Sequence, residues 1–407
     1  MHIVVIGGGA SGLAAAIKAK RSDNKVTILE KNDICGKKIL ATGNGRCNYY
    51  NDNQNLENYN STNKELLPNI INSNNLKKVT MFFDEIGIIP KIKNGYYYPT
   101  TNQAVSVKNS LLLQAQVLGV EIKNNFSVTD VEKLKDKFII KGNDYNLTAD
   151  KVIISTGSYA SFKTQDNAGY KILQKFDHSI VPIVPSLVQL KSEGKFLKLW
   201  NGVRSDVRLY LYEDNNLYQE EKGQIQLTDY GISGICTFNI SGKVSRGLLN
   251  NKKEQVKIDF IPFIDVDGIK DFTTYFSKRN SKLNSRNLDE LLQGILNYKL
   301  VDVILTESKI SKNKKWSDLT EKEIERLYHN LKKFSLNITG TNSFDKAQVC
   351  SGGIPLTEID TKTMESLKVS NLYITGELLD VDGLCGGYNL TFSWITGILA
   401  GGCAAND

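Results

Sequence analysis

Short apolar runs alternate with amphipathic stretches through the first 160 residues, and their order predicts the first elements. Residues 3–6 are a run of β-branched apolar residues, which is typical of a strand buried in a parallel sheet. Residues 13–19 are rich in alanine and favour a helix, and residues 26–29 form a second apolar run. This order predicts a strand–helix–strand unit at the start of the chain.

The same two periodicities predict further elements downstream. Residues 76–86 and 104–118 have helical periodicity, whereas the apolar runs that begin at 151 and at 372 predict two more buried strands. Residues 389–400 predict a closing helix. Short alternating segments predict a small antiparallel meander, at 120–123, 126–133, 137–141 and 146–148.

The middle of the chain differs from its two ends. Residues 186–260 are rich in strand-like segments, with a helical stretch at 234–246 between them. The short strands expected there are 207–212, 217–220 and 224–228. Residues 264–333 are helical and lysine-rich, and 334–338 predict another strand. We therefore expect an insertion between two parts of one α/β domain.

Glycines join the first strand to the first helix with the spacing G-x-G-x-x-G. The first glycine allows a tight turn, the second allows the backbone to approach a pyrophosphate, and the third allows the helix to pack closely on the strand. The helix N-terminus supplies free N–H groups for phosphate. The residues expected around the pyrophosphate are Gly7, Gly9, Ala10, Ser11 and Gly12. Glu30 ends the second strand and can accept hydrogen bonds from a ribose, so the unit predicts a dinucleotide site.

Three later features favour FAD over NAD as the bound dinucleotide. An apolar run followed by Thr156 and Gly157 resembles the second signature of two-dinucleotide-binding flavoproteins. Gly376 and Glu377 resemble the third signature, in which an acid at a strand end holds the ribityl–phosphate region. The usual acid there is aspartate, so the contact of the longer Glu377 is expected to be either shifted or mediated by water.

The third feature is the start of the last helix. A helix N-terminus that points at the flavin stabilises negative charge on the reduced ring. The residues expected at this end of the flavin are Gly387, Asn389 and Leu390. No second G-x-G-x-x-G occurs in the sequence. NAD(P)H would therefore dock transiently as a co-substrate, and oxygen or a bound substrate remains an alternative electron partner.

A polar loop follows the second strand, and its residues are expected near the cofactor. Those expected to line the flavin are Thr42, Gly43, Arg46, Cys47 and Asn48. Arg46 either offsets charge on the reduced ring, binds an acidic substrate or forms a structural ion pair. Cys47 is either a redox thiol or a small packing residue. Lys31 and Lys38 lie either near the adenine and phosphates or on a solvated surface. Tyr96, Tyr97 and Tyr98 either offer a stacking face or a proton donor, or are divided between core and surface as in an ordinary alternating segment. No catalytic acid or base is assigned.

Composition changes this picture little. The chain has 407 residues and a net charge of +7, which permits an anionic ligand but requires none. Its six cysteines include no C-x-x-C pair, which indicates a reducing compartment and argues against dithiol redox chemistry. The three histidines suggest no metal site. Residues 386–404 carry no charge, but their glycines and Asn389 favour a buried helix over a membrane span. We expect a cytoplasmic protein without a membrane or nucleic-acid partner; the oligomeric state is left open.

Two longer blocks resemble one particular family. Residues 36–48 match a loop of the form G-[RK]-K-I-L-A-T-G-x-G-R-C-N. Residues 347–401 include S-G-G, E-I-D, T-M-E-S and G-E-x-L-D-x-D-G-x-x-G-G-Y-N-L. These blocks resemble a bacterial family of NAD(P)/FAD-dependent oxidoreductases that includes aminoacetone oxidase-like and bile-acid-reductase-like proteins.

The resemblance implies a Rossmann-like α/β FAD-binding domain with an inserted β-rich domain and a small helical domain. The expected boundaries are 1–185 with 340–407 for the FAD domain, 186–263 with 334–339 for the β-rich domain, and 264–333 for the helical one. The implied function is an FAD-dependent oxidoreductase acting on a small molecule, with the flavin reduced by transiently bound NAD(P)H or by substrate. An oxygen-using amine oxidase, an RNA-modifying flavoprotein and a non-catalytic flavin-binding protein remain alternatives.

Overall fold

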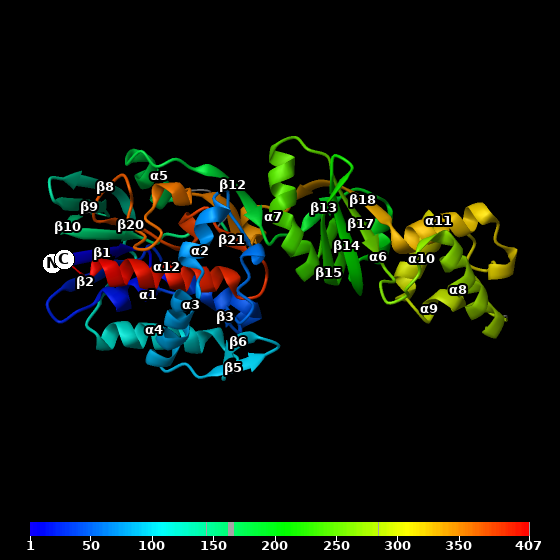
Figure 1. Ribbon diagram of the computed structural model, residues 1–407, viewed down its shortest axis with the longest axis horizontal. Helices are drawn as coiled ribbons and strands as arrows, with labels where there is room; N and C mark the ends of the chain where they lie inside the picture. Colours follow the sequence, from blue (N-terminus) through cyan, green and yellow to red (C-terminus); the bar gives the residue numbers. More distant parts are fainter. Residues whose placement is uncertain (144, 162–166, 284, 407) are drawn as a thin grey trace. The chain divides into compact units, whose positions relative to one another are not determined.

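The computed structural model describes residues 1–143, 145–161, 167–283 and 285–406, and the chain divides into two compact units. The first unit consists of residues 1–184 and 349–407, and the second of residues 185–348. Figure 1 shows the elements of both units along the chain. The first unit is therefore discontinuous in sequence, with its two parts separated by the second unit.

The first unit is built on a five-stranded parallel sheet of order β20-β11-β1-β2-β7. Its strands are β1 (His2–Ile6), β2 (Lys25–Leu29), β7 (Glu121–Lys123), β11 (Lys151–Ile154) and β20 (Leu372–Ile374). β1 and β11 are buried along almost their whole length, as expected of central parallel strands. The prediction of a Rossmann-like α/β fold is confirmed.

Two helices, α1 (Ala10–Ala19) and α12 (Tyr388–Ala404), pack side by side in this unit (Figure 1). Small residues make their close approach possible. A Cβ atom on Gly397 would lie 2.3 Å from the carbonyl oxygen of Ser11, and one on Gly401 would lie 2.2 Å from that of Ala15. Most of α12 is buried, so its uncharged sequence forms part of the core, as expected. Among the described residues, no helix combines the length and apolar character needed to span a membrane.

The remaining elements of the first unit surround this core. Its other helices are α2 (Leu67–Ile70), α3 (Ser73–Glu85), α4 (Ala104–Val117) and α5 (Ala168–Lys175). An antiparallel meander consists of β8 (Val128–Leu134), β9 (Lys137–Gly142) and β10 (Tyr145–Ala149). The prediction that 120–123 belongs to this meander is wrong, because β7 pairs in parallel with β2. A three-residue strand has too little pattern to distinguish the two kinds of pairing.

Two small antiparallel sheets and one further two-stranded sheet accompany the parallel sheet. One sheet has the order β3-β6-β5, with β3 (Tyr50–Asn51), β5 (Pro90–Lys93) and β6 (Tyr96–Pro99). β4 (Tyr59–Asn60) pairs with β21 (Asp382–Gly383). β12 (Val181–Ser186) and β19 (Val349–Gly353) form a two-stranded sheet.

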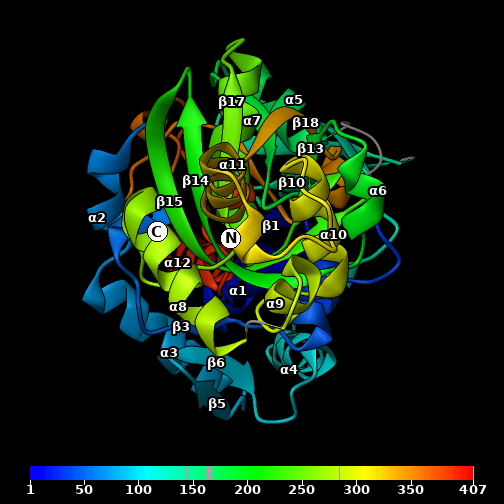
Figure 2. The ribbon, with the colours of Figure 1, turned by 90° about the vertical axis from the view of Figure 1, so that its right-hand side faces the viewer.

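The second unit contains a closed barrel of order β13-β16-β15-β14-β17-β18. The strands are β13 (Leu190–Ser192), β14 (Arg204–Glu213), β15 (Asn216–Thr228), β16 (Gly231–Ser233), β17 (Glu254–Asp259) and β18 (Phe334–Thr341). The long strands β14 and β15 lie side by side (Figure 2). The expectation of separate strands at 217–220 and 224–228 is wrong, because β15 continues through the glycine and polar residues between them.

Helices accompany the barrel in this unit. They are α6 (Phe196–Trp200), α7 (Ile235–Leu249), α8 (Gly268–Lys282), α9 (Leu288–Gln293), α10 (Tyr298–Glu307) and α11 (Glu321–Lys332). The barrel and these helices share one apolar core that includes Trp200, Phe260, Phe272 and Leu331. The division of the chain into three domains stays a prediction.

Candidate cofactor site

The glycine turn joins the carboxyl end of β1 to the start of α1, and packing explains two of its three glycines. Gly7 has a φ of +102°, and a Cβ atom on it would lie 2.5 Å from the carbonyl oxygen of Ser155. A Cβ atom on Gly12 would lie 1.9 Å from the carbonyl oxygen of Gly7. At Gly9, in contrast, no heavy atom lies within 4 Å of the Cβ position. The second glycine therefore faces open space, as the approach of a pyrophosphate requires.

The first turn of α1 is suited to an anion. Gly9 is the N-cap residue, no side chain caps the helix, and the first turn contains no acidic residue. Helix N–H groups without an internal partner and the positive end of the helix dipole therefore remain available to phosphate. Ala10 and Ser11 begin this helix, and a Cβ atom on Gly376 would lie 2.6 Å from Ser11 Oγ. The structure thus brings the first and third flavoprotein signatures together.

Glu30 lies directly after β2 and is 7% exposed. Its Oε2 accepts a hydrogen bond from the Gly8 N–H at 2.7 Å, and its Oε1 accepts one from the Asn32 N–H at 2.9 Å. These bonds hold the carboxylate beside the glycine turn, where an adenosine ribose is expected. Lys31, the next residue, is exposed.

Glu377 forms a second cluster at the carboxyl end of β20. Lys38 Nζ lies 2.6 Å from Glu377 Oε2, and Ser158 Oγ donates to the same oxygen at 2.8 Å. Lys38 is thus ion-paired, although the sequence left it open between a nucleotide contact and a solvated surface. Ser158 was missed, and its position directly after Gly157 was the signal available. Burial raises the pKa of the neighbouring Cys350 thiol to about 12.

Residues of the second signature are held by another residue that sequence reasoning missed. Thr156 Oγ1 donates to Asn167 Oδ1 at 2.8 Å, and Asn167 Nδ2 donates to the Gly157 carbonyl at 2.6 Å. Gly157 has a φ of +72° and no heavy atom within 4 Å of its Cβ position. Asn167 therefore fixes an open turn, and nothing in the local sequence around it indicated this function.

The loop 36–48 contains 3-10 helical turns within Lys37–Gly45, and a kink with non-helical backbone at Thr42, Gly43 and Asn44 interrupts them. Thr42 Oγ1 donates to the Ile39 carbonyl at 2.6 Å, and Gly43 has a left-handed φ of +56°. Cys47 is fully buried, and burial raises the pKa of its thiol to about 12. No disulfide joins the cysteines among the described residues. A neutral, buried Cys47 favours the interpretation as a packing residue over a redox thiol.

The side chain of Arg46 is exposed, in contrast to the buried Cys47 that follows it. Its Nε donates to the Gly43 carbonyl at 3.3 Å, and its guanidinium carbon lies 5.3 Å from the centre of the Tyr98 ring. No carboxylate pairs with it within the described part of the chain, so the structural ion pair considered for Arg46 is absent there. The guanidinium remains available to an anion.

The start of α12 lies beside this loop. Gly387 is the N-cap residue with a φ of +91°, and a Cβ atom on it would lie 3.1 Å from Asn48 Oδ1 and 3.2 Å from the Tyr50 carbonyl oxygen. No side chain caps α12 and no acid lies in its first turn. The Asn389 side chain exchanges two hydrogen bonds of 2.8 Å with the Gly383 backbone. It therefore closes the turn before the helix, and the partly buried Leu390 follows it.

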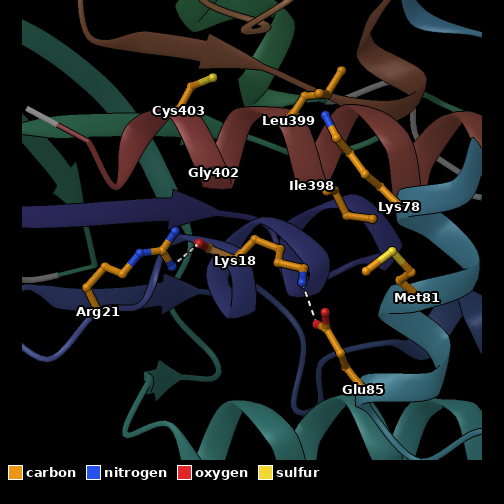
Figure 3. Close-up of a pocket in the computed structure, with 9 residues that line it drawn as sticks. All are labelled: Lys18, Arg21, Lys78, Met81, Glu85, Ile398, Leu399, Gly402 and Cys403. Carbon is orange, nitrogen blue, oxygen red and sulfur yellow. Dashed lines mark hydrogen bonds and ion pairs between the residues drawn. The ribbon is translucent and has the colours of Figure 1, made fainter. Parts of the chain in front are cut away.

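The predicted site residues thus lie at the carboxyl ends of β1, β2, β11 and β20, at the N-termini of α1 and α12, and in the loop 36–48. A surface pocket of about 300 Å³ lies elsewhere, and Figure 3 shows the side chains that line it. They belong to the later parts of α1, α3 and α12, including Lys18, Met81 and Cys403, and no predicted cofactor residue is among them. Over the described ranges, no cluster of histidine, cysteine or acidic residues can hold a metal ion.

Comparison with known proteins gives consistent matches over nearly the whole chain. A family model described as "HI0933-like protein Rossmann domain" matches residues 1–403. A protein of Clostridium scindens named 3-dehydro-bile acid delta(4,6)-reductase is 38% identical over 408 residues, which cover 99% of both chains. The ribosomal RNA dihydrouridine synthase of Haemophilus influenzae is 26% identical over 96% of this chain and 95% of that protein. Among solved structures, 3-ketosteroid-delta4-(5alpha)-dehydrogenase of Rhodococcus jostii has a TM-score of 0.48 and 13% identity, with 100% of this chain and 96% of that chain covered.

Proposed function

The chain belongs to the family of HI0933-like proteins with a Rossmann domain and is an FAD-dependent oxidoreductase, and from this premise we propose that it reduces a carbon–carbon double bond conjugated to a ring ketone, with NAD(P)H as the electron donor. The observation that carries the proposal is the 38% identity to a bile-acid reductase over 99% of both chains. The site geometry supports the cofactor, because Gly9, Gly157 and two uncapped helix N-termini leave open space and N–H groups where FAD is expected.

The residues of the site have separable tasks toward FAD. The N-terminus of α1 would hold the pyrophosphate at Gly9. Glu30 would bind ribose hydroxyls, since each carboxylate oxygen accepts more than one hydrogen bond. Lys38 offsets the charge of Glu377, which reduces repulsion of phosphate by that carboxylate. The N-terminus of α12 would stabilise negative charge on the ring. Bound FAD supplies the hydride-transfer chemistry.

An anaerobic absorbance experiment on the purified holoenzyme tests the proposal. We expect NADH or NADPH to bleach the flavin band, and a 3-oxo-Δ4 steroid acid to restore it in the absence of oxygen. A flavin that ignores both nicotinamides, but is bleached by aminoacetone and recovers in air, would replace the proposal with the amine oxidase alternative.

A second candidate function is RNA reduction. Two relatives named ribosomal RNA dihydrouridine synthase, from Haemophilus influenzae and Escherichia coli, are 26% and 25% identical over 96% of this chain. To test this candidate, the enzyme reduced with NADH or NADPH is incubated with ribosomal RNA that contains no dihydrouridine. Dihydrouridine detected by mass spectrometry, with no turnover of the steroid, would favour this candidate instead.

A further inference from the structure

The small sheet β3-β6-β5 has one face on which lysines and tyrosines alternate. Lys91 pairs with Tyr98 and Lys93 pairs with Tyr96 in the antiparallel register of β5 and β6. Directly paired residues project to the same side of a sheet, so these four side chains share one face. We call them, together with Arg46 above the Tyr98 ring, the cationic–aromatic face.

On the opposite face of the sheet, Tyr97 is packed, whereas Ile92 is 54% exposed. Tyr97 forms edge contacts with Tyr49 and Tyr50, at ring-centre distances of 6.2 and 5.0 Å. Burial and the nearby carboxylate of the exposed Asp52 raise the pKa of Tyr97 to about 12, so this carboxylate lies beside Tyr97. Among the described residues, no ion pair joins Asp52 to Lys91 or Lys93.

The charges on the cationic–aromatic face are uncompensated. All four residues of β5 are exposed, and Tyr96 is 37% exposed. Neither Lys91 nor Lys93 has a carboxylate partner in the part of the chain that the structure describes, and the same holds for Arg46. Three cations beside the exposed ring of Tyr96 and the partly buried ring of Tyr98 form a surface complementary to a ligand that combines phosphates with a flat heterocycle.

The cationic–aromatic face borders the predicted flavin site. A Cβ atom on Gly386 would lie 2.7 Å from Cε1 of Tyr96, so this ring packs against the turn that opens α12. Asn51 Nδ2, from the neighbouring strand, donates to the Gly386 carbonyl at 2.7 Å. Arg46 itself belongs to the loop expected to line the flavin. A ligand on this face would thus lie next to the cofactor.

We propose that the cationic–aromatic face binds the phosphates and the adenine of the NAD(P)H that reduces the flavin. This inference rests on the proposed function, and it supplies a docking place in the first unit, where the described residues contain a single Rossmann-type sheet. Lys91 and Lys93 contact the phosphates, Arg46 contacts the phosphate nearest the flavin, and Tyr96 offers a stacking surface.

The test is isothermal titration of the FAD-loaded enzyme with NADP⁺ and NAD⁺, which reports binding without turnover. The Lys91→Ala/Lys93→Ala variant is compared with Lys64→Ala/Lys77→Ala, which removes the same charge from exposed lysines elsewhere in the first unit. We expect the first variant to raise Kd roughly tenfold and to weaken its salt dependence. The control variant keeps the Kd of the wild type.

The outcomes separate this inference from the proposed function. Equal Kd values in both variants, with the wild-type flavin still bleached by NADPH, overturn the docking face alone. A wild-type flavin that neither nicotinamide bleaches overturns the proposed function as well. Loss of affinity for a single-stranded RNA oligomer, with Kd for NADP⁺ unchanged, assigns the face to RNA and overturns the inference. If the double variant does not fold, Lys93→Glu, a single exposed change, takes its place with the same expected direction.

Discussion

Alanine substitutions at Gly9 and Gly12 are expected to have different effects, although both residues belong to the same glycine turn. Gly9→Ala should weaken FAD binding, and Gly12→Ala should weaken folding. The Cβ position of Gly9 has no heavy atom within 4 Å, and its φ of −78° suits any residue. Gly9→Ala therefore leaves the free energy of unfolding of the FAD-free protein within about 1 kcal/mol of the wild type. The added methyl group fills the space expected for pyrophosphate, so the Kd for FAD rises by roughly tenfold or more, equivalent to about 1.4 kcal/mol.

Gly12→Ala has the opposite signature. Its Cβ atom would lie 1.9 Å from the carbonyl oxygen of Gly7, and only movement of the backbone relieves this overlap. The expected loss of stability is about 1–3 kcal/mol. Urea unfolding of the FAD-free variants measures the free energy of unfolding. Quenching of flavin fluorescence during titration with the protein measures the Kd for FAD. Wild-type FAD affinity in Gly9→Ala would show that no phosphate approaches this residue. Wild-type stability in Gly12→Ala would refute the packing argument.

Glu254, Cys403 and Gly401 allow three further tests, of pH-dependent stability, thiol reactivity and helix packing. Burial and the charge of Glu213 raise the pKa of Glu254, which is 4% exposed, to about 7. Between about pH 4.5 and 7, the Glu254 carboxyl stays protonated in the folded state but loses its proton in the unfolded state. The free energy of unfolding therefore falls by about 2–3 kcal/mol as pH rises through this range. Glu254→Gln should abolish this loss in urea unfolding between pH 5 and 8; an unchanged pH dependence would assign it elsewhere. Iodoacetamide at pH 8 should modify the partly exposed Cys403 before the buried Cys47, and peptide mass spectrometry measures the order. Early modification of Cys47 would instead support its interpretation as a reactive thiol. Gly401→Leu should lower the thermal midpoint by several degrees, because its side chain would overlap the α1 backbone, and an unchanged midpoint would contradict the close packing of α1 and α12.

Local patterns in the sequence were sufficient to predict the main elements of the parallel sheet. The β-branched run at 3–6, the glycine turn and the acid at Glu30 lie close together in the chain, and each requirement is encoded by a few neighbouring residues. The family followed from longer motifs of the same local kind. The pairing of β7 with β2 was not predictable in this way, because a three-residue strand carries the same pattern in either kind of sheet.

The tertiary structure alone decided which distant residues meet at the site. Lys38 and Glu377 are 339 positions apart, and neither residue contains any local signal of their ion pair. Likewise, Tyr96 meets Gly386, and Gly401 meets Ala15, only because the folded chain returns to the first sheet after the second unit. The sequence by itself therefore determined the cofactor-binding unit and its expected residues, since periodicity and turn chemistry act between neighbours. The ion pair of Lys38 with Glu377, the position of Arg46 over Tyr98 and the contact of Tyr96 with Gly386 depend on packing between segments that are distant in sequence, and local patterns do not encode such contacts.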